Sequence, residues 1–335
     1  MGVSRTVVLL WLVLFLTGSG SPGGLQAEDR RLDRSRLTVM TFNTEFLWDG
    51  VPPEEGEASF PHKGSREKAE EHMRGIAEVI RRANPDMVTL LEVENLRALH
   101  TLNEKFLRGL GYRPFLKKGR DWSTGQDAGL LTRIDPLDGV VVYDGRPGRS
   151  GTQTYRVTKN VVAKFAIGSS RIALLGVHLR SQPTAPDRKL MRQAQADAMV
   201  AISTDLRRQG YSLIVMGDFN DFDASPEAID HIDSRPITDV LARVRALDPA
   251  DPTDDLVNAA AFVPQRERFT CFYDRNRNGR VDPPREFNSI DHLLLSKELA
   301  AKVESVRIPR DHDTQKVSDH YPIVVRLRLP RCHHR

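Results

Sequence analysis

The segment that most constrains the fold runs from Leu213 to Asp223 and has the sequence LIVMGDFNDFD. An apolar run that ends in glycine is typical of a strand buried on both faces and closed by a tight turn, and ligands collect at such strand ends. Because alternate residues of an extended chain point to the same side, the Asp218 carboxylate and the Asn220 amide should converge on a cleft. A polar turn after a core strand is the simpler explanation of this motif taken alone, so a functional interpretation depends on the rest of the chain.

Composition limits the classes of protein that the chain can belong to. With 335 residues, 39% of them hydrophobic, it can bury a substantial core in one large domain or two ordinary ones. Lysine and arginine exceed aspartate and glutamate by four, and the sequence pI is about 9.1. This excess permits a phosphate-bearing partner without requiring one, since charge must be clustered to steer a ligand.

Residues 1–27 are typical of a secretion signal peptide. Arg5 precedes the run VVLLWLVLFL, which is too short for a stable membrane anchor, and small residues follow up to Ala27. We therefore expect a secreted or periplasmic protein, with an uncleaved anchor as the alternative because Leu25 is only a fair residue at its cleavage position. Residues 28–36 are predicted to be a flexible lead-in and residues 331–335 a frayed tail, and no other segment is apolar enough to span a membrane.

Helical stripes and short apolar runs alternate along the rest of the chain. Helices are predicted over Ser65–Arg82, Leu96–Leu110 and Arg188–Gln209, and over the short segments Ser225–Asp230 and Pro236–Leu247. Strands are predicted over Leu37–Asn43, Met87–Glu92, Ala128–Thr132, Gly139–Tyr143, Val157–Ile167, Arg171–His178, Phe269–Tyr273, Phe287–Leu295 and Ile323–Leu329, besides the one beginning at Leu213. This order indicates two sheets packed together with helices outside, in one compact domain.

Six of the predicted strands lie next to acidic, amide or histidine side chains. Each polar residue alone has an ordinary explanation, such as capping a turn, but the combination favours one site at which the strand ends meet. The residues are Asn43, Glu45, Glu92, His178, Asp218, Asn220, Asp291, Asp319 and His320.

As an ordered set, these motifs resemble the endonuclease/exonuclease/phosphatase superfamily, which includes pancreatic deoxyribonuclease, abasic-site endonucleases and bacterial sphingomyelinases. The resemblance covers about residues 37–330. It implies a four-layer α/β/β/α sandwich of two packed, mainly antiparallel sheets with outer helices, and cleavage of phosphate esters with a divalent metal, commonly magnesium. It rests on Phe42-Asn43, Leu91-Glu92-Val93, Val177-His178, Gly217-Asp218-Phe219-Asn220, Ile290-Asp291-His292 and Ser318-Asp319-His320-Tyr321-Pro322.

The chemistry of ester hydrolysis suggests a role for each oxygen ligand. Glu92 is a hard ligand suited to Mg²⁺ or Mn²⁺ and is assigned the principal metal contact, with Asn43, Glu45 and Asp319 as nearby or second-site ligands. Asp218 would orient or deprotonate the attacking water. Asn220 would hydrogen-bond the phosphate.

Two histidines, His178 and His320, would donate hydrogen bonds to phosphate oxygens, and each needs a partner that fixes its tautomer. The resemblance pairs His320 with Asp291 and His178 with Asp127. For Asp127, an ordinary position at the start of a strand is an equally good interpretation.

The prediction is therefore a secreted, metal-dependent phosphodiesterase, and we favour a nuclease acting on DNA or RNA. The alternatives are a sphingomyelinase-like or other phosphoesterase and an inactive binding scaffold; the second is disfavoured because no member of the polar set is missing. We expect a monomer with no partner protein and no stable membrane insertion after signal removal. Part of a basic face for nucleic acid could come from Arg180, Arg188, Lys189 and Arg192, although a solvated helix surface explains them equally well.

Two further features have open interpretations. The spacing of Asp274, Asn276, Asn278 and Asp282 around a glycine matches the first part of a structural Ca²⁺ loop, but a plain hairpin loop is favoured because position twelve is not acidic. The two cysteines, Cys271 and Cys332, could pair in an oxidising compartment.

Overall fold

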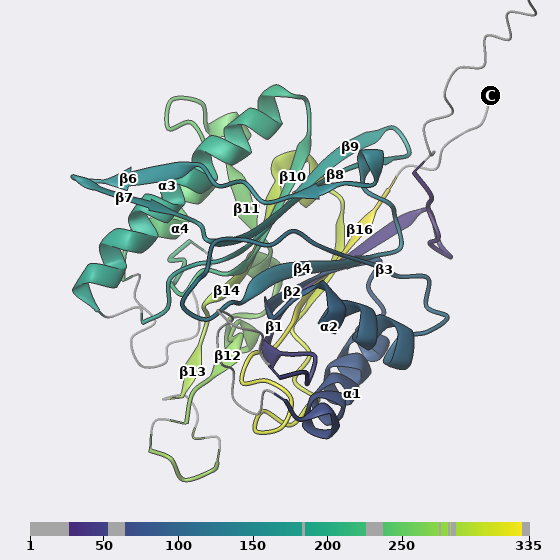
Figure 1. Cartoon of the computed structure of the whole chain (residues 1–335). Coiled ribbons are helices and arrows are strands. Elements are labelled where there is room, and N and C mark those ends of the chain that lie inside the picture. Colours follow the sequence, from purple (N-terminus) through teal and green to yellow (C-terminus); the bar gives the residue numbers. More distant parts are fainter. Residues whose placement is uncertain are drawn as a thin grey trace, which may run out of the picture.

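Two six-stranded sheets pack face to face, with helices on their outer faces (Figure 1). The computed structural model describes residues 27–52, 64–182, 185–225, 237–274, 276–280, 282 and 286–329. One apolar cluster fills the space between the sheets, and two others lie between each sheet and its helices. The predicted four-layer α/β/β/α sandwich is therefore confirmed.

The first sheet holds the amino-terminal strands together with the last two. In this sheet β1 and β2 are parallel, and every other pair of neighbouring strands is antiparallel. Its order is β15 (Val303–Arg307), β16 (Ile323–Arg328), β1 (Arg36–Leu47), β2 (Met87–Val93), β4 (Asp127–Thr132) and β3 (Arg113–Leu116).

The second sheet is built around the strand that opened the sequence analysis, which is β10. It is parallel to β9 and antiparallel to β14. The order is β11 (Leu256–Asn258), β14 (Asp291–Ser296), β10 (Ser212–Asp218), β9 (Ser170–His178), β8 (Lys159–Ile167) and β5 (Val141–Val142). Two separate ribbons pair β6 (Pro147–Ser150) with β7 (Gln153–Arg156) and β12 (Cys271–Phe272) with β13 (Phe287–Asn288).

The helices cover the outer faces because each buries one apolar stripe. In α1 the stripe includes Met73, Ile76 and Ile80, which pack on the first sheet. In α3 it includes Met199 and Ile202, which pack on the second. The α-helices are α1 (Arg66–Ala83), α2 (Leu96–Thr101), α3 (Pro186–Arg208), α4 (Val240–Arg245) and α5 (Lys297–Ala300), and shorter turns are η1 (Leu102–Phe106), η2 (Leu137–Gly139), η3 (Pro252–Asp254), η4 (Ala259–Phe262) and η5 (Gln265–Glu267).

Some predicted elements are shorter or divided in the structure. The helix predicted over Leu96–Leu110 is α-helical only to Thr101 and then continues as the π-helical turn η1. The strand predicted over Phe287–Leu295 is divided into β13 and β14. The predicted helix Ser225–Asp230 lies almost entirely outside the described residues.

The segment from Glu28 to Arg36, which was predicted to be a flexible lead-in, makes defined contacts in the structure. The backbone N–H of Arg30 donates to the carbonyl of Arg133 at 2.8 Å, and its guanidinium pairs with Asp135 at 2.6 Å. These contacts fix the segment against the first sheet, which a count of charged residues does not reveal.

The signal peptide and the carboxyl-terminal tail were predicted for residues that lie outside the described ones, apart from Ala27. Within the described part of the chain, no helix is both long and apolar enough to cross a membrane.

Candidate active site

The second sheet places three predicted site residues next to one another. β10 lies between β9 and β14, and its last residue, Asp218, pairs in register with His178 on β9 and with Asp291 on β14. The Nε2 atom of His178 is 3.6 Å from Oδ2 of Asp218. Residues far apart in the sequence therefore meet at one end of this sheet.

The first sheet adds an amide and a carboxylate to the same site. Asn43 on β1 donates from its Nδ2 atom to Oε1 of Glu92 and to Oδ2 of Asp218, both at 3.2 Å. Glu92, near the end of the parallel neighbour β2, is 3.8 Å from Nε2 of His178. Because Asn43 bonds to residues of both sheets, it joins the two halves of the site.

His320 lies just before the last strand and is oriented by Asp291. Its Nδ1 atom is 2.7 Å from Oδ2 of Asp291, which is the predicted pairing. The Ser318 hydroxyl donates to the carbonyl of Asn43 at 2.7 Å and accepts from the His320 N–H at 3.1 Å. The Nε2 atom of His320 lies 3.9 Å from Oδ2 of Asp218.

The two histidines differ in charge because their neighbours differ. Burial lowers the pKa of His178 well below its usual value, and nearby Lys159 and His320 add to this effect. Burial alone would lower the pKa of His320 as well, but the electrostatic effects of Asp291, Cys271 and Asp319, together with the hydrogen bond to Asp291, outweigh burial and raise that pKa well above the usual value. At neutral pH the site therefore holds one neutral and one protonated imidazole.

Asp218 is the carboxylate best suited to accept a proton. Burial raises its pKa, the negative charge of Asp291 raises it further, and the positive charge of His320 acts in the opposite direction. The Asn220 N–H donates to Oδ1 of Asp218 at 2.8 Å and holds the carboxyl group in place. The Asn220 side chain donates to the carbonyl of Leu179 at 3.4 Å, a weak bond that a phosphate oxygen could replace.

Glu45 and its neighbours have the properties of a cation site. Oε2 of Glu45 accepts from the Asp319 N–H at 3.1 Å. Burial raises the pKa of Glu45 to about 7, and the nearby charges of Asp319 and Glu92 contribute. A divalent cation would relieve this repulsion, so the oxygen ligands fit the group that the sequence implies.

The tightest clusters of possible metal ligands do not include the two glutamates that the sequence analysis assigned to the metal. Among the described histidines, cysteines, aspartates and glutamates, two groups have ligand atoms within 4.8 Å of one another: Asp218 with Asp291 and His320, and Cys271 with Asp319 and His320. Glu92 and Glu45 belong to neither group. Their roles as metal ligands therefore stay predictions.

Backbone geometry explains the residues at these strand ends. Gly217 has a φ of +144°, and a Cβ there would lie 1.9 Å from the carbonyl oxygen of Val177, so only glycine fits. Glu45, Glu92 and Asn220 have φ values of +48°, +60° and +49°, a left-handed conformation that is uncommon for residues other than glycine. Such conformations concentrate at functional sites.

Asp127 does not pair with His178, contrary to the prediction. It accepts from the Gly119 N–H at 2.7 Å and pairs with Lys118 at 2.9 Å, while Nδ1 of His178 has no hydrogen-bond partner among the described residues. Consecutive residues of an extended chain point to opposite sides, so the preceding residue, Gln126, reaches the site instead.

Gln126 and Lys159 were missed by the sequence analysis. Nε2 of Gln126 donates to Oε2 of Glu92 at 3.0 Å, and Oε1 accepts from Nζ of Lys159 at 3.2 Å. Lys159 also lies 3.5 Å from Oδ2 of Asp121. A positive charge at the start of β8 is an ordinary strand pattern, so only tertiary contacts identify it.

Arg192 cannot belong to a basic face, because its side chain is fully buried in α3 and pairs with the buried Asp221. Arg180 lies at the site, and its Nε atom is buried without a hydrogen-bond partner among the described residues. Arg188 and Lys189 are at the start of α3.

The interpretation of residues 273–286 as a hairpin loop agrees with the antiparallel pairing of β12 and β13. Asp274 accepts from backbone N–H groups of Asn278 and Gly279, and Asp282 accepts from the Asn276 and Asn278 amides. Calcium binding stays a prediction. Cys271 is buried and forms no disulfide with any described residue, and its possible partner, Cys332, lies outside the described residues, so their pairing stays a prediction.

The packed sheets and the polar groups at their shared end define the class of protein, a hydrolase of phosphoric esters. The sequence profile of the endonuclease/exonuclease/phosphatase family matches residues 40–320, so the chain belongs to this family. A search of curated proteins finds no match.

Solved structures with the same fold are distant in sequence. The 3′–5′ exonuclease NExo from Neisseria meningitidis is 16% identical, with a TM-score of 0.56 over 86% of this chain and 98% of that chain. An AP endonuclease from Archaeoglobus fulgidus is 14% identical, with a TM-score of 0.53 over 86% and 98%. Truncated TDP2 from Caenorhabditis elegans is 16% identical, with a TM-score of 0.53 over 87% and 97%.

Proposed function

We propose that this protein is a secreted, divalent-metal-dependent phosphodiesterase that hydrolyses DNA or RNA. The observation that carries the proposal is the bridge made by the Asn43 side chain. It bonds to Glu92 on its own sheet and to Asp218 on the other sheet. It gathers acids, amides and two histidines, whose pKa values are shifted in opposite directions, at one place. Export is inferred from the signal-like residues 1–27 alone.

Each of three side chains would have its own role in hydrolysis. Asp218, whose pKa is raised, would accept the proton of the attacking water. His320 in its protonated form would donate to a phosphate oxygen and stabilise developing negative charge. His178 is neutral, and its Nε2 atom faces Glu92 and Asp218, where a phosphate oxygen could accept from it.

A metal ion would complete the site. Glu92, with Asn43, Glu45 and Asp319, would hold Mg²⁺ or Mn²⁺, and the charge of such an ion neutralises non-bridging phosphate oxygens. Structures of two neighbours in the comparison contain nucleic acid products: D. rerio TDP2 is complexed with a single-strand DNA product and a Neisseria NExo variant is bound to a product DNA hairpin. These complexes support a nucleic-acid substrate here by analogy of fold.

The test compares four substrates under identical conditions: plasmid DNA, RNA, sphingomyelin vesicles and bis-(p-nitrophenyl) phosphate. Each is incubated with the purified protein and Mg²⁺ or Mn²⁺, with EDTA as the metal-free control. We expect cleavage of nucleic acid and of the small diester, and no cleavage in EDTA. Cleavage of sphingomyelin alone would contradict the proposal and favour the lipid phosphoesterase alternative.

Variants then test the site assignment. Asp218→Asn should lower the rate by a factor of about 10² to 10⁴, the usual contribution of a general base. His320→Gln should lower it as well. Asp251→Asn makes the same change at an exposed carboxylate that is not part of the candidate site, and it is the matched control. Full activity of Asp218→Asn would contradict the assignment.

A further inference from the structure

Among the described residues, Phe46 is the one aromatic residue with a positive φ. It follows Glu45 at the end of β1, and both residues have positive φ values, +66° for Phe46 and +48° for Glu45. A left-handed conformation is an outlier for a bulky residue and persists only where the surrounding structure imposes it. Here it coincides with the shift in register between β1 and β2 that follows Asn43.

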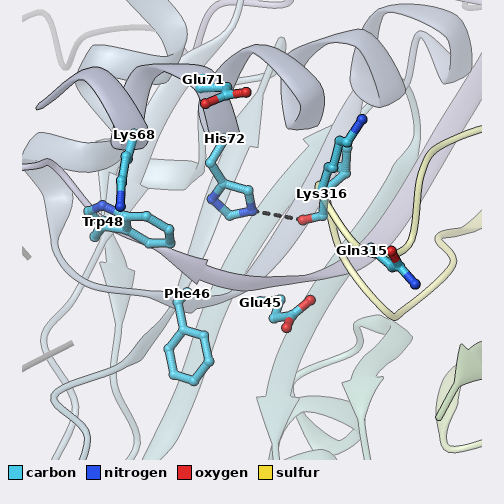
Figure 2. Close-up of a pocket in the computed structure, with 9 residues that line it drawn as sticks. Glu45, Phe46, Trp48, Lys68, Glu71, His72, Gln315 and Lys316 are labelled. Atoms are coloured by element: carbon cyan, nitrogen blue, oxygen red, sulfur yellow. Dashed lines mark hydrogen bonds between the residues drawn. The ribbon is translucent and has the colours of Figure 1, made fainter. Parts of the chain in front are cut away.

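Phe46 lines two pockets, one that includes Glu45 and one that includes Glu92 and His178. The first has a volume of about 410 Å³ and lies against α1 and the loop before His320; its lining includes Glu45, Lys68 and Lys316. Figure 2 shows the Phe46 ring on the side of β1 away from α1, while His72 projects toward the strand from that helix.

The second pocket has a volume of about 190 Å³ and contains residues of both sheets. Its lining includes Phe46, Glu92, His178, Lys159 and Arg180. The half-buried Phe46 is thus a wall shared by two spaces, each of which contains one of the proposed metal-binding glutamates.

Each pocket carries two cationic and two acidic side chains: Lys68 and Lys316 with Glu45 and Glu71 in the first, and Lys159 and Arg180 with Glu92 and Asp121 in the second. The buried Nε of Arg180 has no hydrogen-bond partner among the described residues, and a buried unpaired donor is costly. A phosphate oxygen would satisfy it. Each pocket therefore offers cationic side chains that a phosphate oxygen could contact.

We propose that Phe46 divides the path of a single-stranded nucleic acid, so that the phosphates on either side of the cleaved bond occupy the two separate pockets. This inference rests on the proposed function. A flexible strand can turn around the ring and stack a base on it, whereas a duplex would have to bend and unstack. A small phosphomonoester would occupy neither pocket fully.

The test measures cleavage of an end-labelled oligonucleotide as a single strand and as a duplex, with bis-(p-nitrophenyl) phosphate as a substrate that lacks neighbouring phosphates. We expect the wild-type protein to prefer the single strand by about tenfold, the value of one base–aromatic stacking contact. Phe46→Gly should bring the ratio of the two rates close to one. Phe46→Tyr, which keeps the ring, should retain the preference.

Two controls separate this effect from a loss of folding. Phe46→Asn also removes the ring, and asparagine tolerates the left-handed conformation. This variant replaces Phe46→Gly if circular dichroism shows that Phe46→Gly is unfolded. Phe262→Gly alters a half-exposed aromatic residue in η4 that lines neither pocket, and should keep the wild-type ratio.

The salt dependence of single-strand binding tests the two pockets separately. Arg180→Ala and Lys316→Ala should each make the slope of log affinity against log salt shallower by about 0.7, the value for one phosphate contact. An unchanged slope in either variant would remove the corresponding pocket from the substrate path.

The outcomes distinguish this inference from the proposed function. If the wild-type protein cleaves nucleic acid but shows no preference for the single strand, or if the ringless variants keep the preference, the role of Phe46 is wrong and the nuclease assignment stands. If it cleaves no nucleic acid, both are wrong.

Discussion

Replacing Glu45 with glutamine should stabilise the metal-free protein at alkaline pH. The pKa of Glu45 is raised from 4.5 to about 7, chiefly by burial and then by Asp319 and Glu92. The folded protein therefore binds this proton more tightly than the unfolded chain, and stability from this group falls as the pH rises from about 4.5 to 7. Glutamine keeps the acceptor for the Asp319 N–H and removes the charge.

The size of the effect follows from the shift. A difference of 2.5 pKa units between 4.5 and about 7 corresponds to about 3.4 kcal/mol at 1.36 kcal/mol per unit. Glu45 is partly exposed, so solvent screening reduces this to roughly 1.5–2 kcal/mol. For a chain of this size, the melting temperature of Glu45→Gln at pH 8 should be about 2–3 °C higher than that of the wild type.

Thermal unfolding in EDTA at pH 4 and pH 8 measures this difference. The stabilisation should appear at pH 8 and be absent at pH 4, and Mg²⁺ should raise the melting temperature of the wild type more than that of the variant. Glu104→Gln, in which an exposed side chain changes, is the control. A variant that is less stable than the wild type at pH 8 in EDTA would refute the reasoning.

Three further substitutions test the geometry of the site and its support. Asp291→Asn removes the charge that keeps His320 protonated, so the alkaline limb of the pH–rate profile should move down by about one to two units, the value of a charge-assisted hydrogen bond. Gly217→Ala forces a Cβ to within 1.9 Å of a backbone oxygen and should lower the free energy of unfolding in urea by more than about 2 kcal/mol. Arg192→Met leaves the buried Asp221 without its ion-pair partner and should cost about 3–5 kcal/mol in the same assay.

The sequence predicted the strands that build the site because their signal is local. β10 is a continuous apolar run followed by glycine, and β2 is a similar apolar run that leads to Glu92. The Asp291–His320 pairing was also expected, but it came from the family resemblance, and the structure shows the bond at 2.7 Å.

Features that depend on tertiary packing could not be predicted in this way. Asp127 and Gln126 are adjacent, and choosing between them requires knowing which side of β4 faces the site. Arg192 has the sequence pattern of a surface helix residue, yet its guanidinium is enclosed beside Asp221.

The ribbon of β6 and β7 was missed for a similar reason. Its glycines and arginines are typical of a loop, but the ribbon packs on α3, where a Cβ at Gly148 would lie 1.7 Å from the carbonyl oxygen of Ala194. That close approach, which only glycine permits, holds the ribbon against the helix and is invisible in the sequence.

The central claim is that carboxylates of both sheets act together on a metal-dependent phosphodiester cleavage. The most direct measurement is the rate of cleavage of a labelled nucleic acid in Mg²⁺ by the wild type, by Glu92→Gln and by Asp218→Asn, with EDTA as control. We predict cleavage by the wild type that EDTA abolishes and that each substitution lowers by at least about a hundredfold. Equal rates for the wild type and Glu92→Gln, or undiminished cleavage in EDTA, would contradict the account.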